Sequence, residues 1–472
     1  MVKSSEIHPY MSILQPKPHT LDSPHGMLAL GLASISLGQA LHNGNGSINV
    51  TALFYLTFAL IFLSWALFGR LKFSETFFRR ITFPLLLLGL LLQIYQLAFD
   101  YFGSSQFLSL LPTLWQFRLG VLIAGGLAVA SLITRTSSTV QNTLTVLVLM
   151  VLWFSGAWLI ENLPYPFIDV FVFQQNSSRA LINGENPYLL TVPYIYGDLS
   201  GYSTELVRDG WFTFGSPYPP LSIYLSSIGY VFWGDIRYSH LLAFLLSGAL
   251  IAFLQSGRTS KLAAYLFLFM PRSFYVLEMS WTEPLVVFLF TATIYCALYH
   301  PRWLVIPAGL LFVSKQYMLF FVPLILMLLP YKAAWSVWIK RIAQIAFVGL
   351  VVTAPLAFWS FHSFVWNIVS VHLKQMLRLD ALTYLAMYTR ITNVEPSQWI
   401  GFAVLVFCFY WTWRFFPRTP AGFSSAFAFC LLTFFAFSKQ AFCNYYYLVI
   451  GMICCTVSSF NPESPLNLLE KS

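Results

Sequence analysis

The chain contains 472 residues, of which 58% are hydrophobic and only 9% are charged, whereas about 25% of the residues of a soluble domain are charged. Its formal net charge is +9 at pH 7. This composition excludes an ordinary soluble protein. In so apolar a chain, Lys and Arg retained at the cytoplasmic edges of membrane helices explain the basic excess better than nucleic-acid binding does. We therefore predict an all-α, multi-pass integral membrane protein that binds no nucleic acid.

Apolar segments recur along almost the whole sequence. A helix that crosses a bilayer needs about 20 mostly apolar residues, because only a closed hydrogen-bond ladder satisfies the backbone in hydrocarbon. On this criterion we expect about 13–14 transmembrane helices. The candidate segments are residues 27–42, 50–69, 81–99, 118–134, 143–160, 217–233, 239–256, 261–277, 283–299, 303–330, 341–361, 399–416, 422–437 and 443–459.

Positive charges in the short loops indicate the orientation of these helices. The loop 70–80 contains four Lys or Arg residues, whereas residues 43–49 and 100–117 contain none. Because cytoplasmic loops retain Lys and Arg, the N-terminus is predicted to be cytoplasmic. The other basic residues used for orientation are Lys332, Lys340, Arg341, Arg414 and Arg418. Together they place the C-terminus in the cytoplasm and the loops 161–216 and 362–398 outside.

The region between those two outer loops must cross the membrane an odd number of times, and two arrangements fit. In the first, all five apolar segments cross and Glu283 faces the cytoplasm. In the second, residues 261–282 enter the membrane and return, and residues 303–330 break into two short helices around Lys315. Both arrangements leave Arg258 outside, against the usual charge bias. We favour the second, because Lys315 would otherwise lie in mid-membrane.

We divide the chain into an N-terminal membrane extension of about four helices, residues 1–140, and a core, residues 141–472, with the outer loop 161–216. This loop is too long for a simple hairpin and too rich in Phe, Tyr and Trp for a disordered linker. Within it, "DVFVFQQNSSRALI", residues 169–182, places apolar side chains on one side of a helix. We expect one or two interfacial helices here, with aromatic rings at headgroup level.

Asp169 begins this expected helix, a few residues beyond an apolar segment. One interpretation is structural, because an Asp at a helix start accepts backbone N–H hydrogen bonds and offsets the positive end of the helix dipole. The other interpretation is catalytic, because one carboxylate beside a partly dry cleft can act as a general base on a hydroxyl. Position alone leaves both open.

Two turn-forming sequences follow in the same loop. In "GENPY", Gly184 permits a positive φ, Asn186 favours a turn, and the proline fixes its own φ. In "FTFGSPYPP", two prolines follow Tyr218 and suit the first turn of the next helix, whose N–H groups lack partners. Each sequence is structurally ordinary by itself.

Taken in order, these motifs resemble the first outer loop of the GT-C glycosyltransferases. The resemblance is closest to glycosyltransferase family 87, the polyprenyl-phosphate-mannose-dependent mannosyltransferases. That family has an Asp with an aromatic residue four positions later, a Gly-rich turn that ends in Tyr, and a Tyr-Pro-Pro preceded by an aromatic residue. The corresponding residues are Asp169 with Phe173, Gly184 with Tyr188, and Phe214 with Tyr218, Pro219 and Pro220.

The resemblance implies a GT-C fold and a hexosyltransferase, mannosyl or other, with a polyprenyl-phosphate sugar as donor. In that activity Asp169 would take a proton from the acceptor hydroxyl, whose oxygen attacks the anomeric carbon with inversion while polyprenyl phosphate leaves. The departing phosphate requires cations where water is scarce. The predicted donor-phosphate residues are His372, Lys315, Arg272 and Arg378, and the predicted substrate-binding residues are Tyr188, Tyr218, Glu283 and Asn186.

Several alternatives stay open at the level of sequence. Lys315 near a helix end can snorkel to the headgroups, and Glu283 can be a helix cap. The family's Asp usually follows the first helix, whereas here the extension 1–140 precedes the resemblance. A lipid-linked polysaccharide polymerase or ligase, relying on the loop 362–398, is a second class of function. A flippase or transporter of lipid-linked sugars is a third.

The expected partners are a lipid-linked sugar donor, a glycolipid, glycan or other hydroxyl acceptor, and membrane lipids. We expect no cofactor and no divalent metal, although Asp169 with Glu283 would form a candidate metal site if both face outward. The expected location is the plasma (inner) membrane in a bacterium or the endoplasmic reticulum in a eukaryote.

Overall fold

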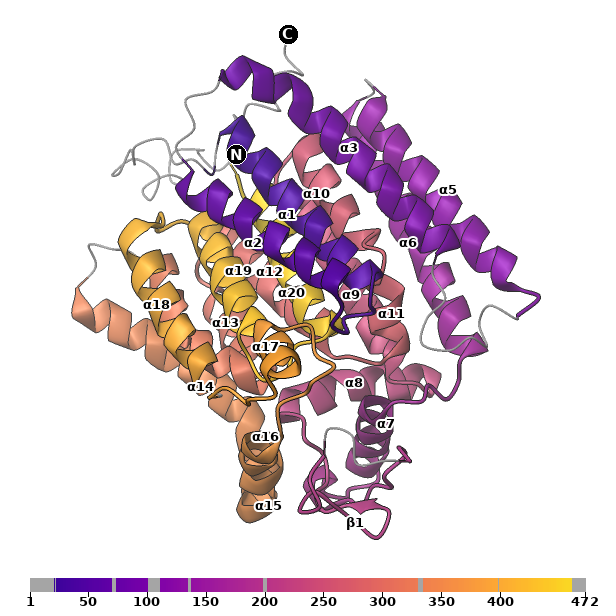
Figure 1. Cartoon of the computed structure of the whole chain (residues 1–472), viewed down its shortest axis with the longest axis vertical. Coiled ribbons are helices and arrows are strands. Elements are labelled where there is room, and N and C mark those ends of the chain that lie inside the picture. Colours follow the sequence, from indigo (N-terminus) through magenta and orange to yellow (C-terminus); the bar gives the residue numbers. More distant parts are fainter. Residues whose placement is uncertain are drawn as a thin grey trace, which may run out of the picture.

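The computed structural model describes residues 21, 23–69, 74–100, 111–134, 137–197, 202–329, 334–397 and 399–460. Regular structure in these ranges is almost all helical, and most helices run between the two ends of the molecule (Figure 1). We call one end the loop end, because it carries α7 (Asp169–Ile182), α15 (Phe361–Val365) and a small hairpin. The prediction of an all-α protein is confirmed, apart from that hairpin.

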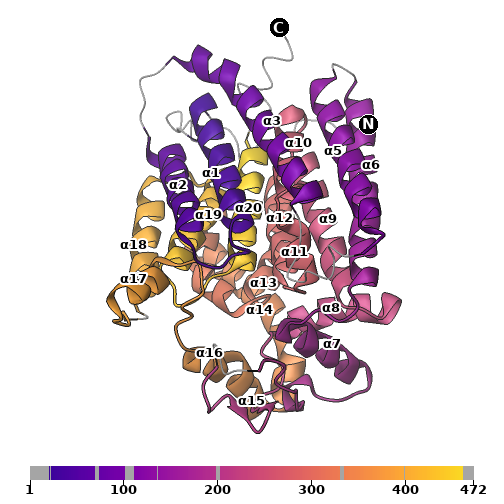
Figure 2. The same ribbon diagram turned by 45° about the vertical axis from the view of Figure 1, so that its right-hand side comes forward.

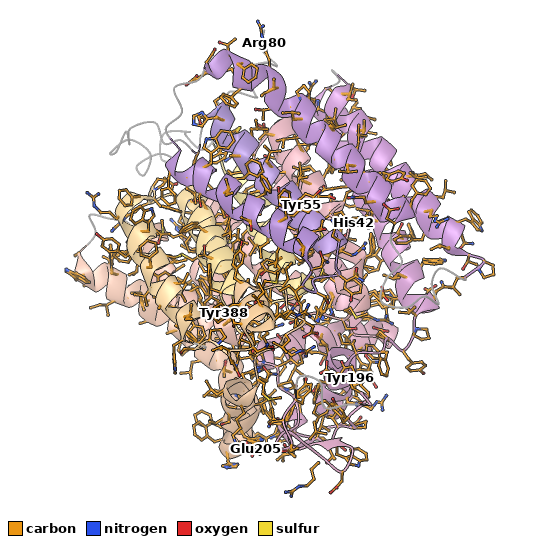
Figure 3. The ribbon with its side chains drawn as sticks, in the orientation of Figure 1. His42, Tyr55, Arg80, Tyr196, Glu205 and Tyr388 are labelled. Carbon is orange, nitrogen blue, oxygen red and sulfur yellow. The ribbon has the colours of Figure 1, made fainter. Side chains whose placement is uncertain are left out.

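Figure 3 shows Arg80 at the opposite end of the molecule, and Tyr196 and Glu205 at the loop end. Four described helices belong to the extension: α1 (Pro24–His42), α2 (Val50–Phe68), α3 (Glu75–Phe99) and α5 (Leu114–Ile133). The other long helices are α6 (Ser138–Asn162), α9 (Arg237–Phe253), α10 (Arg258–Leu268), α12 (Glu283–Tyr299), α14 (Trp335–Trp359), α18 (Ile400–Phe415), α19 (Pro420–Ala436) and α20 (Cys443–Ser458).

Five described helices, α2, α3, α5, α6 and α14, are each long and apolar enough to cross a membrane. Shorter apolar helices, among them α12, α18, α19 and α20, pack between them. A helix satisfies its own backbone groups, which makes it suitable for hydrocarbon. The chain is therefore a multi-pass integral membrane protein, as the composition predicts.

Helix α1 is buried on nearly every side, whereas α2 exposes much of its apolar surface. Gln39 of α1 and Gln96 of α3 exchange two side-chain hydrogen bonds of 2.7 and 2.9 Å, and such polar pairs hold membrane helices together. Ser34 Oγ lies 3.5 Å from Cys454 Sγ of α20. Buried apolar residues from α1 to α20 form one continuous cluster. The extension and the core therefore share one hydrophobic interior.

Helix α8 (Pro220–Trp233) does not cross the bundle alongside α9, as the segment 217–233 was predicted to do. It meets α9 at 111° and lies across the loop end (Figure 2). Helix α9 therefore ends at the opposite end, where Arg258 Nη2 donates to the carbonyl of Thr134 at 3.3 Å. The prediction that Arg258 lies on the same side as Asp169 is wrong, because apolar composition does not distinguish a crossing helix from one that lies flat.

Residues 261–282 do not enter and return as predicted. They continue from α10 into α11 (Ser273–Glu278), which lies toward the loop end (Figure 1). Pro271 lies between the two helices, where its missing N–H interrupts the helical ladder. The interruption therefore bends a single pass and does not reverse it.

The segment 303–330 breaks around Lys315, as predicted. Helix α13 (Val305–Phe312) ends before this residue, and the 3₁₀ helix η3 (Gln316–Leu328) begins after it. Lys315 itself has an extended backbone, with φ −149° and ψ 146°. The break brings its side chain to the first turn of α12.

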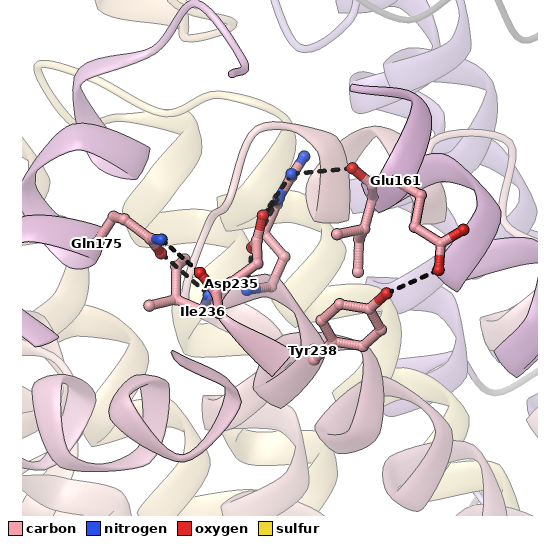
Figure 4. A network of polar contacts seen from close by, with 8 residues as sticks. Glu161, Gln175, Asp235, Ile236 and Tyr238 are labelled. Carbon is pink, nitrogen blue, oxygen red and sulfur yellow. Dashed lines mark hydrogen bonds and ion pairs between the residues drawn. The ribbon is translucent and has the colours of Figure 1, made fainter. Parts of the chain in front are cut away.

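Arg237 is fully buried at the start of α9 and joins three elements. Figure 4 shows Asp235 and Gln175 in the network of polar contacts around it. Its Nε donates to both carboxylate oxygens of Asp235 at 3.0 and 3.1 Å, and Nη2 donates to the carbonyl of Ile160 in α6 at 3.2 Å. The guanidinium also lies 5.2 Å from the ring centre of Phe171 in α7. Beside it, Gln175 bonds the backbone of the α8–α9 turn at 2.7 and 3.2 Å. This joint fixes α7 to the membrane helices.

Arg237→Ala is expected to lower the free energy of unfolding by about 3 kcal/mol, because it removes the cationic partner of the Asp235 carboxylate and one of the hydrogen bonds to the Ile160 carbonyl. Thermal unfolding of the purified protein in detergent measures the loss. Arg208→Ala, on the exposed hairpin, is the matched control and is expected to unfold as the native protein does. An Arg237→Ala protein as stable as the control would contradict the role of the joint.

Two chain regions, distant in sequence, form the layer at the loop end. The first contains α7, the short helix η2 (Pro187–Leu189), and the antiparallel strands β1 (Val207–Arg208) and β2 (Trp211–Phe212); the second contains α15, the π-helix η4 (Trp366–Ser370), α16 (Val371–Lys374) and α17 (Tyr384–Thr392). Phe173 of α7 stacks on Phe214, with ring centres 5.4 Å apart. Helix α7 has the bounds predicted from sequence, whereas the hairpin is not predicted.

Candidate active site

Asp169 is the first residue of α7 and is half-buried. Its Oδ2 accepts a 2.5 Å hydrogen bond from the Tyr202 hydroxyl, and its backbone N–H donates to the Tyr196 hydroxyl at 3.1 Å. The carboxylate also accepts from the backbone N–H of Val170. Asp169 therefore bonds both the first turn of α7 and the tyrosines of the outer loop. The N-cap position itself is taken by Ile168.

Burial raises the pKa of the Asp169 carboxyl above its ordinary value because a low-dielectric surrounding disfavours the charged form. Hydrogen bonds from Tyr202, Val170 and Tyr196, and the charge of Arg378, lower this pKa but do not cancel the effect of burial. Burial also raises the pKa of both phenols. The tyrosines therefore stay protonated at neutral pH, and the carboxylate beside them is a stronger base than an exposed one.

Tyr202→Phe is expected to move the acidic limb of the kcat/KM pH profile to higher pH. The tyrosine hydroxyl stabilises the ionised carboxylate of Asp169, so its loss raises the pKa of that carboxyl further. A general base works only when ionised, and the rate falls as the pH drops through its pKa. Initial rates over a pH series measure the shift, with Tyr165→Phe, 87% exposed, as the control. An unmoved limb would mean that Asp169 does not control the rate.

Arg378 lies at the loop end between α16 and α17. Its Nε and Nη2 donate to the two carboxylate oxygens of Asp380 at 2.8 and 2.7 Å, and its guanidinium lies 5.1 Å from the ring centre of Phe442. Burial alone would raise the pKa of Asp380, but the bidentate pairing lowers it. The charge of Arg378 also acts on Asp169 and Tyr202, and it lowers the pKa of the Asp169 carboxyl.

Glu283 and Lys315 form a second charged pair at the loop end. Lys315 Nζ donates to Glu283 Oε1 at 2.7 Å and to Thr282 Oγ1 at 2.9 Å. The Tyr317 hydroxyl donates to the same Oε1 at 3.2 Å. Glu283 is fully buried, and its Oε2 has no hydrogen-bond partner among the described residues. This oxygen is therefore a buried acceptor whose hydrogen-bonding capacity the described residues leave unused.

Tyr218 connects the two charged groups. Lys315 Nζ lies 5.5 Å from the centre of its ring. Burial raises the pKa of the Tyr218 phenol, and the charges of Asp169 and Glu283 raise it further. Both predicted acids therefore act on the phenol of one tyrosine, which lies two residues before α8 begins at Pro220.

His372 in α16 contacts the chain on both ring nitrogens. Its Nε2 lies 2.9 Å from Gln316 Nε2 and 3.2 Å from the carbonyl oxygen of Pro217, and its Nδ1 lies 3.3 Å from Gln375 Oε1. Burial lowers the pKa of His372, so the ring is neutral at pH 7. Lys439 Nζ donates to the carbonyl oxygens of His372 and Gln375, each at 2.8 Å, and supplies the positive charge here.

The turn after α7 is a support for the site. Gly184 has φ +74°, the conformation for which glycine is suited. Asn186 Oδ1 accepts from the backbone N–H of Tyr188 at 2.9 Å, and Tyr188, 2% exposed, donates to the Tyr218 carbonyl at 2.9 Å. A Cβ on Gly215 would lie 2.8 Å from the carbonyl oxygen of Pro187. Substrate binding by Asn186 and Tyr188 stays a prediction, since their described bonds hold the turn.

Arg272 is directed elsewhere. Its Nε donates to Asn45 Oδ1 at 2.6 Å and its Nη2 to the His42 carbonyl at 3.0 Å, both at the α1–α2 turn. The structure thus brings together Asp169, Arg378, Lys315, His372, Tyr218 and Glu283 at the loop end, while Arg272 faces the extension. Donor-phosphate binding by Arg272 also stays a prediction.

The described residues contain no group of three His, Cys, Asp or Glu side chains that could hold a metal ion. The expectation of no metal and no cofactor stays a prediction. Two described cavities lie away from Asp169: one is lined by residues of α1, α3, α10 and α20, the other by residues of η3 and α18.

Sequence reasoning missed four residues of this site: Tyr196, Tyr202, Asp380 and Lys439. The aromatic density of the outer loop was recognised, but nothing in it marks which tyrosine meets Asp169. The Arg-x-Asp spacing of Arg378 and Asp380 was a usable local signal. The short polar stretch "SKQ" before α20 was another, because a lysine between two apolar segments commonly lies at a membrane surface.

Comparison of the sequence with protein-family models and with curated proteins gives no match. Among solved structures, two crystal structures of ArnT from Cupriavidus metallidurans are similar. They are the form bound to undecaprenyl phosphate, with a TM-score of 0.42, and the apo form, with a TM-score of 0.43. Each is 15% identical and covers 70% of this chain, which spans 62% of the ArnT chain.

Proposed function

We propose that this protein is a membrane glycosyltransferase of the GT-C type. It transfers a sugar from a polyprenyl-phosphate sugar to an acceptor hydroxyl on the non-cytoplasmic side, with Asp169 as the general base. The observation that carries the proposal is the convergence of a half-buried carboxylate with Arg378 and the Glu283–Lys315 pair at one end of a membrane bundle.

The geometry around Asp169 fits a base that receives a hydroxyl. Its Oδ2 already accepts a hydroxyl hydrogen bond, from Tyr202 at 2.5 Å, and an acceptor hydroxyl would make the same bond to a general base. When the acceptor takes that position, the proton passes to Asp169 while the acceptor oxygen attacks the anomeric carbon. The bond from that carbon to the phosphate oxygen breaks, and the configuration inverts.

The leaving polyprenyl phosphate builds up negative charge that fixed cations stabilise best. Arg378 and Lys315 each reach the site with a carboxylate partner, so their positions are fixed before the donor binds. Neutral His372 would contribute a hydrogen bond and not a charge. The buried Glu283 Oε2 would accept a hydrogen bond from a hydroxyl of the sugar. Arrangements of this kind require no reorganisation at the moment of reaction.

The choice of donor tests the proposal. Membranes from cells that express the chain are supplied with labelled polyprenyl-phosphate mannose, polyprenyl-phosphate glucose or the corresponding sugar nucleotides, and labelled product is measured. We expect transfer from a lipid-linked sugar, with mannose or another hexose as the expected sugar, and none directly from a nucleotide. Activity that depends on His372 and Arg378 but not on Asp169 would indicate a polysaccharide polymerase or ligase instead.

A further inference from the structure

The turn between α1 and α2, residues 43–49, lies at the ends of these two helices that face the loop end, although it belongs to the extension (Figure 1). Its sequence, "NGNGSIN", contains no charge and no apolar residue except Ile48. Ile48 is nevertheless 7% exposed, and Gly46 is buried. A polar turn that merely joined two membrane helices would face water, so this turn has a packing role.

The turn pairs with the segment that carries Arg378. The backbone N–H of Ile48 donates to the carbonyl of Asp380 at 2.9 Å, and Ser47 forms an isolated antiparallel bridge with Ala381. The partner residue Asp380 is the one whose carboxylate holds the Arg378 guanidinium at 2.7 and 2.8 Å. The extension is therefore connected to Arg378 of the candidate site through a single residue, Asp380.

Residues 378–382 are held on their other side as well. Arg378 N donates to the Lys439 carbonyl and Leu382 N to the Ala441 carbonyl, each at 3.0 Å. The segment is thus fixed between the α1–α2 turn and residues 439–441. Removal of either neighbour leaves backbone groups of the segment without partners, and Arg378 then loses its fixed position.

Close packing fixes the turn itself. Gly46 has φ +84°, and a Cβ added there would lie 2.0 Å from the backbone nitrogen of Cys443 at the start of α20. Asn45 also has a positive φ, 53°, and its Oδ1 accepts from Arg272 Nε at 2.6 Å. Alanine at position 46 would be strained in this conformation and would collide with backbone. The turn has little freedom to move.

We propose that the turn 43–49 is a positioning element, which holds the segment 378–382 and thereby fixes the guanidinium of Arg378 at the loop end through its pairing with Asp380. In this role Gly46 is a positioning residue that acts through Asp380 and Arg378. The extension thus helps to build the outer site. The effect of the turn on sugar transfer rests on the proposed function.

A kinetic test uses Gly46→Ala. We expect a fall in kcat/KM of about tenfold to a hundredfold, because a shift of about 1 Å near the chemistry has this effect. In the Arg378→Ala background the same substitution is expected to add less than twofold, because both changes act through one guanidinium. Gly126→Ala, in α5 of the same extension with no atom within 4 Å of an added Cβ, is the control. If Gly46→Ala lowers kcat/KM in the Arg378→Ala background as much as it does in the native protein, the proposal is overturned.

A second readout does not depend on sugar transfer. We expect trypsin in detergent solution to cleave the Arg378–Leu379 bond faster when the segment is released, and mass spectrometry follows that cleavage. Gly46→Ala is expected to speed it at least tenfold, whereas Gly126→Ala leaves the rate unchanged. If transfer from lipid-linked sugars is never found but the cleavage rate responds, the proposed function fails and the positioning stands.

A cross-link keeps the proposal testable if Gly46→Ala fails to fold. Antiparallel neighbours have Cα separations of roughly 4.5–5.5 Å, which suit a disulfide. Ser47→Cys with Ala381→Cys is therefore expected to cross-link under mild oxidation, and the oxidised form to resist cleavage at Arg378 more than the reduced form. Failure to cross-link would show that the turn does not lie against the segment.

Discussion

Asp169→Asn is expected to lower kcat/KM for sugar transfer by about 10²–10⁴-fold, the usual contribution of a general base. Asn is close in shape and still accepts a hydrogen bond from the Tyr202 hydroxyl, but its amide oxygen does not take a proton at neutral pH. The loss should appear in kcat, with the donor KM little changed, because the interaction is made in the transition state. Initial rates with labelled polyprenyl-phosphate sugar measure both constants.

The control for this variant is Asp209→Asn. Asp209 is exposed in the hairpin turn of the same outer loop, and its φ of 50° suits Asn equally well. It is expected to keep full activity and stability. Full activity in Asp169→Asn would show that the carboxylate only supports the helix start, and the case for a GT-C reaction would then fail. If Asp169→Asn fails to fold while Asp209→Asn folds, the carboxylate is likewise assigned to structural support of the helix start.

Helix α7 shows what local sequence determines. Its bounds, Asp169–Ile182, follow from an acid at the start, apolar residues on one side and a turn motif at the end. Gly184 adopts the positive φ that the turn motif predicts. The break at Lys315 was predictable for a different reason, because an ammonium in mid-membrane is so costly that the helix must open around it.

Other elements depend on contacts that no local pattern contains. Helix α8 lies across the loop end, at 111° to α9. The Arg237–Asp235 ion pair lies at the turn between these helices and stabilises that angle. The β1–β2 hairpin did carry a signal, since Asp209 and Gly210 form the Asp-Gly pair typical of two-residue hairpin turns. That signal was overlooked in a chain otherwise composed of apolar helices.

The candidate site was predictable residue by residue but not pair by pair. Charged residues are scarce in so apolar a chain and stand out within and between its apolar segments, so Lys315, Arg378 and Glu283 were identified. Their partners were not, because Lys315 and Glu283 meet only through the packing of α12 against the break before η3. The same reasoning explains Arg272, whose direction toward Asn45 depends on how the extension packs on the core.

Lys315→Met is expected to cause the largest loss of stability among the site variants. Glu283 is fully buried and Lys315 Nζ is its cationic partner at 2.7 Å, so removal of the ammonium leaves an uncompensated carboxylate or forces it to take up a proton. Breaking one side of a buried pair costs about 3–5 kcal/mol. Methionine retains most of the side-chain volume, so the loss reports charge and not a cavity. Thermal unfolding in detergent measures it.

The double variant Lys315→Met with Glu283→Gln separates stability from function. Without either charge, the pair is replaced by two neutral side chains of similar volume, a change that is often neutral or stabilising. We therefore expect the melting temperature to return close to that of the native protein. Sugar transfer should stay at least tenfold below native, since the phosphate still lacks its Lys315 cation and a sugar hydroxyl lacks the Glu283 oxygen. Recovered transfer in the double variant would assign the pair to folding alone and leave Arg378 and Lys439 as the cations of the donor site.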